Sequence, residues 1–145
     1  MEKEKTCKIV FSDIDGTLLT SDGQITEGTK EMILNLEKKG IPFILTSARS
    51  PEGVRVIKRM LGNHAPIIAF CGGLILDNDG HEIYSKMIPL KRALELKAML
   101  DKDFPAVACN TFGGEKWIVD DRDDWREQRE EKIVGFPAEI GSIKD

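Results

Sequence analysis

The chain has 145 residues, of which 41% are hydrophobic and 32% are charged, and its formal net charge is −4 at pH 7. This length fits one ordinary domain or slightly more, and this composition is typical of a globular protein rather than a disordered one. Charges of both signs are interspersed without a basic patch, which argues against nucleic acid as the main partner. No apolar stretch approaches the roughly 18 residues of a membrane span, so we expect no membrane partner.

The three cysteines, Cys7, Cys71 and Cys109, are an odd number at irregular spacing. The first residues are charged and lack the apolar core of a signal peptide. We therefore expect reduced thiols and a cytoplasmic protein.

The first predicted element belongs to residues 8–19, KIVFSDIDGTLL. Its apolar run, residues 9–11, predicts a short buried strand. Because alternate residues of an extended chain point the same way, Asp13 and Asp15 are expected to project together from the end of that strand. Two neighbouring carboxylates repel each other, and a divalent cation such as Mg²⁺ is the usual counterion. Gly16 removes a Cβ where a ligand would approach the backbone.

The acid pair also has two simpler interpretations. A calcium-binding loop that began at Asp13 would need glycine at its sixth position and glutamate at its twelfth, where this chain has Leu18 and Gln24. A plain turn explains the Asp-Gly step, but not the apolar strand before it or the two leucines after it. A functional site is the favoured interpretation.

The segment FSDIDGTLLT resembles the first motif of the haloacid-dehalogenase-like phosphohydrolases, in particular the Cof-type sugar-phosphate phosphatases. The resemblance implies that Asp13 is the nucleophile that becomes an aspartyl-phosphate and that Asp15 is the general acid and base. It also implies Mg²⁺ on the Asp13 carboxylate and the Asp15 backbone carbonyl, with Gly16 and Thr17 near the phosphate. The implied substrate is a small phosphorylated metabolite.

Further elements follow in the order helix, strand, helix, strand, at about residues 26–39, 41–45, 51–61 and 66–70. The first helix has an apolar stripe made of Ile25, Thr29, Met32, Ile33 and Leu36. The alternation predicts an α/β fold with a doubly wound parallel (Rossmann-like) sheet, strand order one-two-three and both helices on one face. Ligands of such sheets bind beyond the carboxyl ends of the strands.

Ser47 and Arg49 follow the second predicted strand. In the family, a serine or threonine at this place bonds the transferring phosphoryl oxygen, so the resemblance makes Ser47 a phosphate ligand. Alone, it would also fit a hydroxyl that caps backbone groups at a helix entry. Arg49 either orients a phosphate or braces the loop by pairing with a carboxylate, and both roles stay open.

After the third strand, Cys71 stands where the family commonly has asparagine, and we expect a small buried residue there. Residues 74–76 and 82–88 predict a hairpin with a solvated acidic tip at 77–80. His64 and His81 are expected to be ordinary surface residues, because neither has a metal-ligand partner at a suitable spacing.

From residue 87 the chain resembles the first half of the α/β cap that Cof-type members insert after the third strand. We expect a phosphatase core at 1–86 and a partial cap at 87–145. The cap should contain a helix at about 89–101 and strands at 107–110 and 116–119. A partly helical segment at 120–132 should follow, with Trp125 as its large anchor. The aspartates at 120, 121, 123 and 124 are expected to form a solvated helix start rather than a metal cluster.

The resemblance covers only the N-terminal portion of the family pattern. The lysine of the third motif and the Gly-Asp pair of the fourth have no counterpart after Trp117. Activity of this chain alone is therefore expected to be weak or absent. The first strand would also lie at a sheet edge, which favours pairing with another chain. The alternative is thus a non-catalytic fragment that binds or self-associates through that edge, and a phosphotransferase or mutase would share the first motif.

Overall fold

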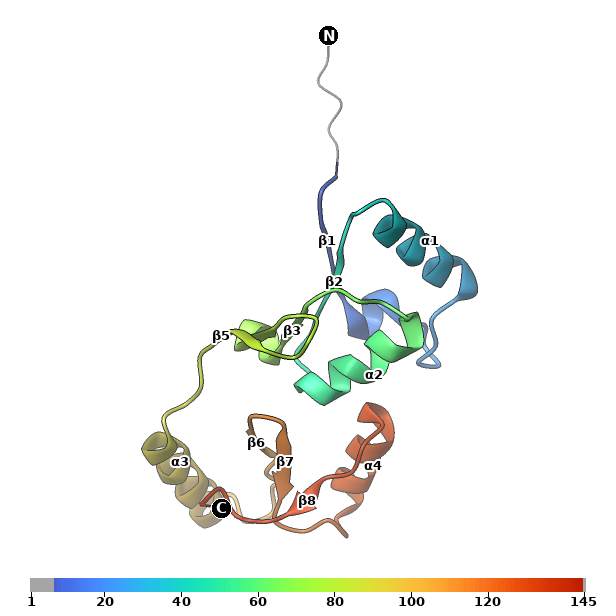
Figure 1. The fold of residues 1–145 in the computed structure, drawn as a ribbon. Coiled ribbons are helices and arrows are strands. Elements are labelled where there is room, and N and C mark those ends of the chain that lie inside the picture. Colours follow the sequence, from blue (N-terminus) through green and yellow to red (C-terminus); the bar gives the residue numbers. More distant parts are fainter. Residues whose placement is uncertain (1–6, 145) are drawn as a thin grey trace. The chain divides into compact units, whose positions relative to one another are not determined.

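The computed structural model describes residues 7–144, and the chain divides between Ser85 and Lys86 into two compact units, each with its own sheet (Figure 1). The first unit contains β1 (Val10–Asp13), α1 (Glu27–Lys38), β2 (Phe43–Thr46), α2 (Pro51–Leu61), β3 (Ile67–Ala69), β4 (Leu74–Leu76) and β5 (Glu82–Ser85). The second contains α3 (Leu90–Asp103), β6 (Thr111–Gly113), β7 (Lys116–Val119), α4 (Trp125–Val134) and β8 (Glu139–Ile140).

The first unit is built on a five-stranded sheet in the order β1-β2-β3-β4-β5. β1, β2 and β3 are parallel, and β4 and β5 continue the sheet as an antiparallel hairpin. This arrangement confirms the α/β, Rossmann-like class and the order of the first three strands. Parallel pairing also brings the carboxyl ends of β1 and β2 together, with Asp13 opposite Thr46.

Helix start and stop signals in the sequence coincide with the observed ends of α1 and α2. The Thr26 hydroxyl accepts a hydrogen bond from the Thr29 amide at 3.2 Å and so caps α1. Ser50 caps α2 in the same way, and Pro51 occupies its first position. Gly62 ends α2 in the left-handed conformation that a glycine adopts without strain.

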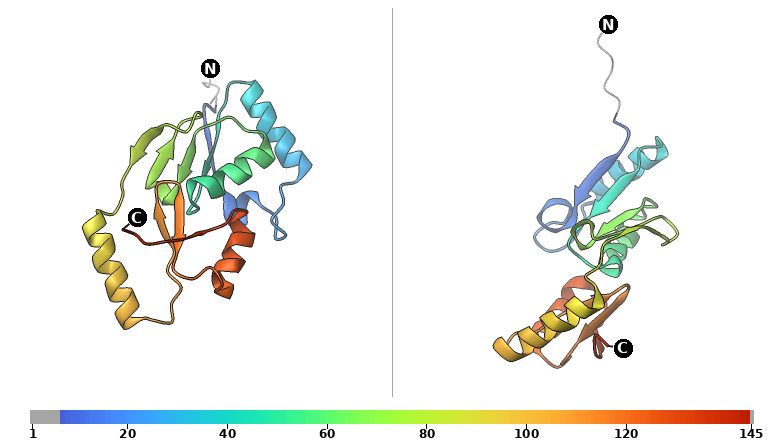
Figure 2. Two further views of the ribbon diagram at one scale, coloured as in Figure 1. Left: turned by 60° about the horizontal axis from the view of Figure 1, so that its bottom comes forward. Right: turned by 90° about the vertical axis from the view of Figure 1, so that its left-hand side faces the viewer.

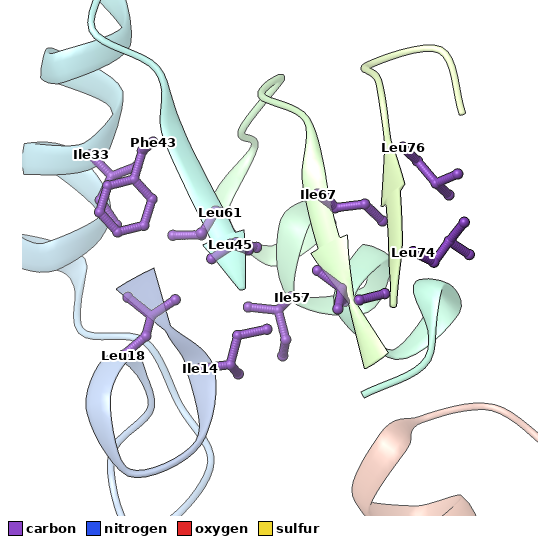
Figure 3. Close-up of a cluster of buried hydrophobic side chains, with 12 residues drawn as sticks. Ile14, Leu18, Ile33, Phe43, Leu45, Ile57, Leu61, Ile67, Leu74 and Leu76 are labelled. Atoms are coloured by element: carbon purple, nitrogen blue, oxygen red, sulfur yellow. The ribbon is translucent and has the colours of Figure 1, made fainter. Parts of the chain in front are cut away.

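One apolar cluster holds the first unit together (Figure 3). Its members are Ile14, Leu18, Ile33, Phe43, Leu45, Val54, Ile57, Leu61, Ile67, Ala69, Leu74 and Leu76. Because Ile33 of α1 and Ile57 of α2 share this cluster with alternate residues of the strands, both helices cover the same face, where they lie side by side (Figure 2). Met32 was wrongly assigned to the apolar stripe: it is 64% exposed, one residue away from the inward position of Ile33.

β1 lies at the edge of this sheet, as expected from the absence of further strands. Phe11 is 56% exposed and Ile9 also faces solvent in part. The outer edge of β1 therefore presents backbone groups that no strand among residues 7–144 covers, and Phe11 adds an exposed apolar side chain on one face of the strand.

The second unit has a three-stranded sheet in the order β6-β7-β8. The strand expected at 107–110 is wrong, because the observed β6 begins at Thr111 and pairs antiparallel with β7 through a turn at Gly114 and Glu115. β8 pairs parallel with β7 and was not anticipated, since two residues give too little pattern to read.

Trp117, not Trp125, is the anchor of the second unit. Trp117 is 2% exposed and packs with Val119, Val134 and Ala138, whereas Trp125 is 66% exposed. α3 buries none of its residues, although its sequence carries apolar positions at helical spacing.

Candidate active site

The turn after β1 places the two aspartates. A single wide helical turn, Ile14–Leu18, is closed by a bond from the Leu19 amide to the Ile14 carbonyl at 3.0 Å. The backbone is extended at Asp13 and Asp15, and the Ile14 side chain between them is completely buried. Asp13 and Asp15 are exposed, so both face away from the core, as the alternation predicts.

Gly16 adopts φ of 75°, a conformation that residues with a Cβ rarely tolerate. A Cβ at this position would meet no protein atom within 4 Å. The glycine is thus required here by backbone conformation, and the space beside it is open. Thr17, the next residue of the predicted phosphate site, is exposed.

Ser47 lies directly after β2, one residue beyond the position that pairs with Asp13. Its amide donates to the Ile68 carbonyl at 3.0 Å, and its Oγ accepts from the Arg49 amide at 3.1 Å. Its side chain is buried. Ser47 therefore shares the carboxyl edge of the sheet with Asp13, and its hydroxyl also performs the backbone-capping role that the sequence left open.

Arg49 forms a two-pronged ion pair with Asp15. Its Nε donates to Oδ2 at 2.9 Å and its Nη2 donates to Oδ1 at 2.7 Å. The side chain of Arg49 is only 10% exposed, which holds the guanidinium in place. The hydrogen bonds and charge of Arg49 lower the pKa of Asp15, and partial burial opposes that shift. Of the two roles left open for Arg49, this structure contains the pairing with a carboxylate.

The residues fit a hard divalent cation such as Mg²⁺ in one specific way. Both carboxylate oxygens of Asp15 accept hydrogen bonds from Arg49, so the backbone carbonyl is the oxygen of this residue that would remain to hold an ion. The Asp13 carboxylate is exposed and accepts no hydrogen bond from any residue between 7 and 144. One free carboxylate and one carbonyl suit Mg²⁺, which keeps several waters and takes few protein ligands.

Cys71 contradicts the expectation of a buried residue, because its side chain is exposed. It follows β3 in a short turn and has φ of 53° and ψ of 32°, the left-handed region. Asparagine tolerates this conformation far better than cysteine, so the backbone here is strained. The Cys71 amide donates to the Ser47 carbonyl at 2.9 Å, which ties this strained turn to the site.

The hairpin tip between β4 and β5 also differs from expectation. Ligand atoms of Asp77, Asp79 and His81 lie within 4.8 Å of one another, and Asp77 Oδ2 lies 3.2 Å from His81 Nδ1. His81 therefore has acidic neighbours at metal-ligand spacing. The turn that brings them together is closed by Asp77 Oδ1, which accepts from the amides of Asp79 and His81. The residues alternate as Asp-x-Asp-x-His, a signal that the sequence interpretation overlooked.

None of the helices within residues 7–144 has the length and apolarity that crossing a lipid bilayer requires. The first unit belongs to the open α/β sheets, whose ligands bind beyond the carboxyl ends of parallel strands. The chain matches the family of haloacid dehalogenase-like hydrolases over residues 10–142 and belongs to that family.

Several relatives are similar to this chain. A Haemophilus influenzae protein named "Putative phosphatase" is 36% identical over 124 residues, which cover 79% of this chain and 47% of that protein. A phosphoglycolate phosphatase of Thermoplasma volcanium is 38% identical over 73 residues, half of this chain and 33% of that protein. A haloacid dehalogenase-like hydrolase from Bacteroides thetaiotaomicron has the same fold, with a TM-score of 0.84 at 20% identity over 94% of this chain and 52% of that one. The chain thus spans about half the length of the first of these relatives.

Proposed function

We propose that this chain carries the nucleophile half of a Mg²⁺-dependent phosphohydrolase that acts on a small phosphate ester. The observation that supports this most directly is the free, exposed carboxylate of Asp13 at the carboxyl end of β1, one position from Ser47 across the sheet. Membership of the hydrolase family supplies the reaction class.

In the first step, an Asp13 carboxylate oxygen bonds to phosphorus while the bond from phosphorus to the ester oxygen breaks. Asp15 gives a proton to that leaving oxygen, and the products are an aspartyl-phosphate and an alcohol. In the second step, Asp15 takes a proton from water, whose oxygen bonds to phosphorus and releases inorganic phosphate and the Asp13 carboxylate. Ser47 and the backbone around Gly16 and Thr17 hold the phosphoryl oxygens.

A bound Mg²⁺ would supply charge neutralisation between Asp13 and the phosphate, held by the Asp13 carboxylate and the Asp15 carbonyl. The ion pair with Arg49 keeps Asp15 ionised in this structure. An ionised carboxylate is suited to take a proton from water but has none to give to a leaving group. A substrate phosphate that attracts the Arg49 guanidinium would release Asp15 for the first proton transfer.

The third and fourth family motifs have no counterpart in this sequence. Phosphoryl transfer depends mostly on positioning and charge stabilisation, so the lysine and the additional metal carboxylate matter greatly. Their absence is expected to raise the barrier by several kcal/mol, at about 1.4 kcal/mol per tenfold in rate. The chain alone should still bind phosphate analogues, although it should turn substrates over slowly or not at all.

The decisive experiment is binding of beryllofluoride, which mimics an aspartyl-phosphate, followed by ¹⁹F NMR. In the presence of Mg²⁺, the wild-type chain should show a bound fluoride signal, and Asp13→Asn should remove it. Asp22→Asn is the matched control, because Asp22 is an exposed aspartate of the following turn. A bound signal that survives in Asp13→Asn, or no bound signal in the wild type, would contradict the proposal.

A second candidate function rests on the uncovered edge of β1, where Phe11 is exposed. Such an edge favours pairing with a strand of another chain, so the chain would then act as a non-catalytic, self-associating fragment. Analytical ultracentrifugation of the wild type and of Phe11→Lys tests this function. Self-association that the charged variant abolishes supports it, and a monomer at all concentrations rules it out.

A further inference from the structure

A cavity of about 360 Å³ lies within the second unit, lined by the end of α3, the segment before β6 and the start of α4. Leu100, Phe104 and Val107 provide apolar wall. The lining also contains five carboxylates, those of Asp101, Asp120, Asp121, Asp124 and Glu127. The proposed phosphohydrolase chemistry uses none of these residues.

Glu127 is the unusual member of this group, because it is 2% exposed and carries an unsatisfied oxygen. Its Oε1 accepts from Asn110 Nδ2 at 3.1 Å, and Asn110 Oδ1 in turn accepts from Trp117 Nε1 at 2.5 Å. Its Oε2 is buried and has no hydrogen-bond partner among residues 7–144. An orphaned buried carboxylate oxygen is costly, so it requires an explanation.

Helix capping does not explain Glu127. It stands three residues after Asp124, the N-cap of α4, where a glutamate often bonds back to the N-cap amide. Here the Asp124 amide donates to the Asp121 carbonyl at 3.4 Å instead. The Glu127 side chain therefore turns inward although a local partner was within reach along the helix.

The cationic side chains nearest the cavity form ion pairs with carboxylates other than that of Glu127. Lys97 Nζ pairs with Asp101 and Asp120 at 2.5 and 2.7 Å. Arg126 bonds both carboxylate oxygens of Asp124 and the Ala106 carbonyl. Neither Asp121 nor Glu127 forms an ion pair with a residue between 7 and 144, so the cavity retains negative charge.

The spacing of these carboxylates disfavours a single metal ion. Between residues 7 and 144, only Asp77, Asp79 and His81 form a group of three or more ligand atoms within 4.8 Å of one another. Oxygens spread around an apolar wall match an organic cation instead, whose N–H groups and carbon chain extend over several ångströms.

We propose that this cavity binds a small organic ammonium ion, which donates to Glu127 Oε2 while its aliphatic part lies against Leu100, Phe104 and Val107. The ammonium supplies both the missing hydrogen bond and the missing positive charge. This assigns the second unit a ligand site of its own, and it does not depend on the phosphohydrolase function.

The test is a calorimetric titration of the full chain with 1,4-diaminobutane at low ionic strength. Glu127→Gln keeps the Oε1 acceptor for Asn110 but places an NH₂ group where Oε2 was, and it should weaken binding at least tenfold. Glu130→Gln makes the same charge change on an exposed position of α4 and should leave binding unchanged. Butan-1-ol, which has the carbon chain without the charge, should not bind.

Several outcomes would overturn the proposal. These are no saturable binding by the wild type, equal binding by Glu127→Gln, equal binding of butan-1-ol, or displacement of the diamine by equimolar Mg²⁺. A measurement that needs no variant follows the indole N–H of Trp117 and the side-chain amide of Asn110 by NMR. Both signals should shift on titration, because both groups belong to the chain of hydrogen bonds that ends at Glu127.

Discussion

Arg49 and Asp15 are 34 residues apart in sequence, yet the guanidinium of one bonds both oxygens of the other's carboxylate, at 2.9 and 2.7 Å. Asp15 lies in the turn Ile14–Leu18 that follows β1, and Arg49 lies in the segment that follows the neighbouring strand β2. Their meeting is a direct result of parallel pairing between the two strands. The ion pair lowers the pKa of Asp15, which is the residue proposed to transfer protons.

The first prediction concerns this ion pair. Arg49→Met should raise the pKa of Asp15 towards its ordinary value, because the donor that lowers that pKa is gone. A carboxylate whose folded-state pKa is lowered contributes stability above its unfolded pKa and loses it as pH falls through the folded pKa. The variant should therefore be less stable at pH 7 by at most about 1 kcal/mol, as expected for a partly exposed pair.

Urea unfolding at pH 7 and pH 3 measures the stability difference, and ¹³C NMR of the Asp15 carboxyl measures its pKa. Arg59→Met is the control, since Arg59 pairs with Glu52 on exposed α2 surface. An unchanged Asp15 pKa in Arg49→Met would show that the pair does not persist in solution.

The second prediction concerns turnover. With p-nitrophenyl phosphate and Mg²⁺, this chain should be at least about 1,000-fold slower than a family member that carries all four motifs, which corresponds to about 4 kcal/mol of barrier. The missing third and fourth motifs are the reason. Mg²⁺-dependent turnover at full rate that Asp13→Asn abolishes would refute this expectation and show that the chain is sufficient.

The third prediction concerns Cys71, which has an exposed side chain and a left-handed backbone. Cys71→Asn should raise the free energy of unfolding by about 1 kcal/mol, because asparagine occupies that backbone region with less strain. Thermal unfolding followed by circular dichroism is the measurement. Cys7→Asn, also at an exposed cysteine but without positive φ, should have no effect. Equal effects at both positions would mean that the gain comes from thiol removal.

The fourth prediction concerns Glu127 in amine-free buffer. Burial raises the pKa of its carboxyl, so in the folded chain this carboxyl stays protonated to pH values above 4.5, its ordinary pKa. The free energy of unfolding then falls as pH rises from 4.5 through the pKa that Glu127 has in the folded chain. Glu127→Gln should stabilise the second unit by about 1–3 kcal/mol at pH 7, the range for an unsatisfied buried group, and by little at pH 4.

Near-ultraviolet circular dichroism of the buried Trp117 reports unfolding of this unit. Glu130→Gln should change stability equally little at both pH values. A stabilisation by Glu127→Gln that does not vary with pH would indicate repacking rather than relief of a buried charge.

Local chemistry made the first unit predictable from sequence. Thr26 and Ser50 cap the helices where expected, and short β-branched runs form the parallel strands. The second unit was harder, because its helix α4 is polar nearly all round and its strands have only two to four residues. Two tryptophans eight residues apart look equivalent in sequence, and only the pairing of β7 decides that Trp117 is the buried one.

The candidate site was also predictable from the sequence only in part. The placement of Asp13, Asp15 and Ser47 at one sheet edge was predictable, because strand periodicity and parallel pairing determine it. The partner of Arg49 was not predictable, because the local sequence fitted both contact with a phosphate and pairing with a carboxylate. The contact of His81 with Asp77 was missed because it depends on how tightly the hairpin turn closes. The catalytic roles themselves stay a proposal.

The small buried area of α3 affects how fast its backbone amides exchange hydrogen with solvent. It has 14 residues, buries none of them, and its ion pairs reach the rest of the described chain only through Lys97. An isolated helix of that length is marginal in water. Its backbone amides should therefore exchange with deuterated solvent earlier than those of β2, which is flanked by strands on both sides.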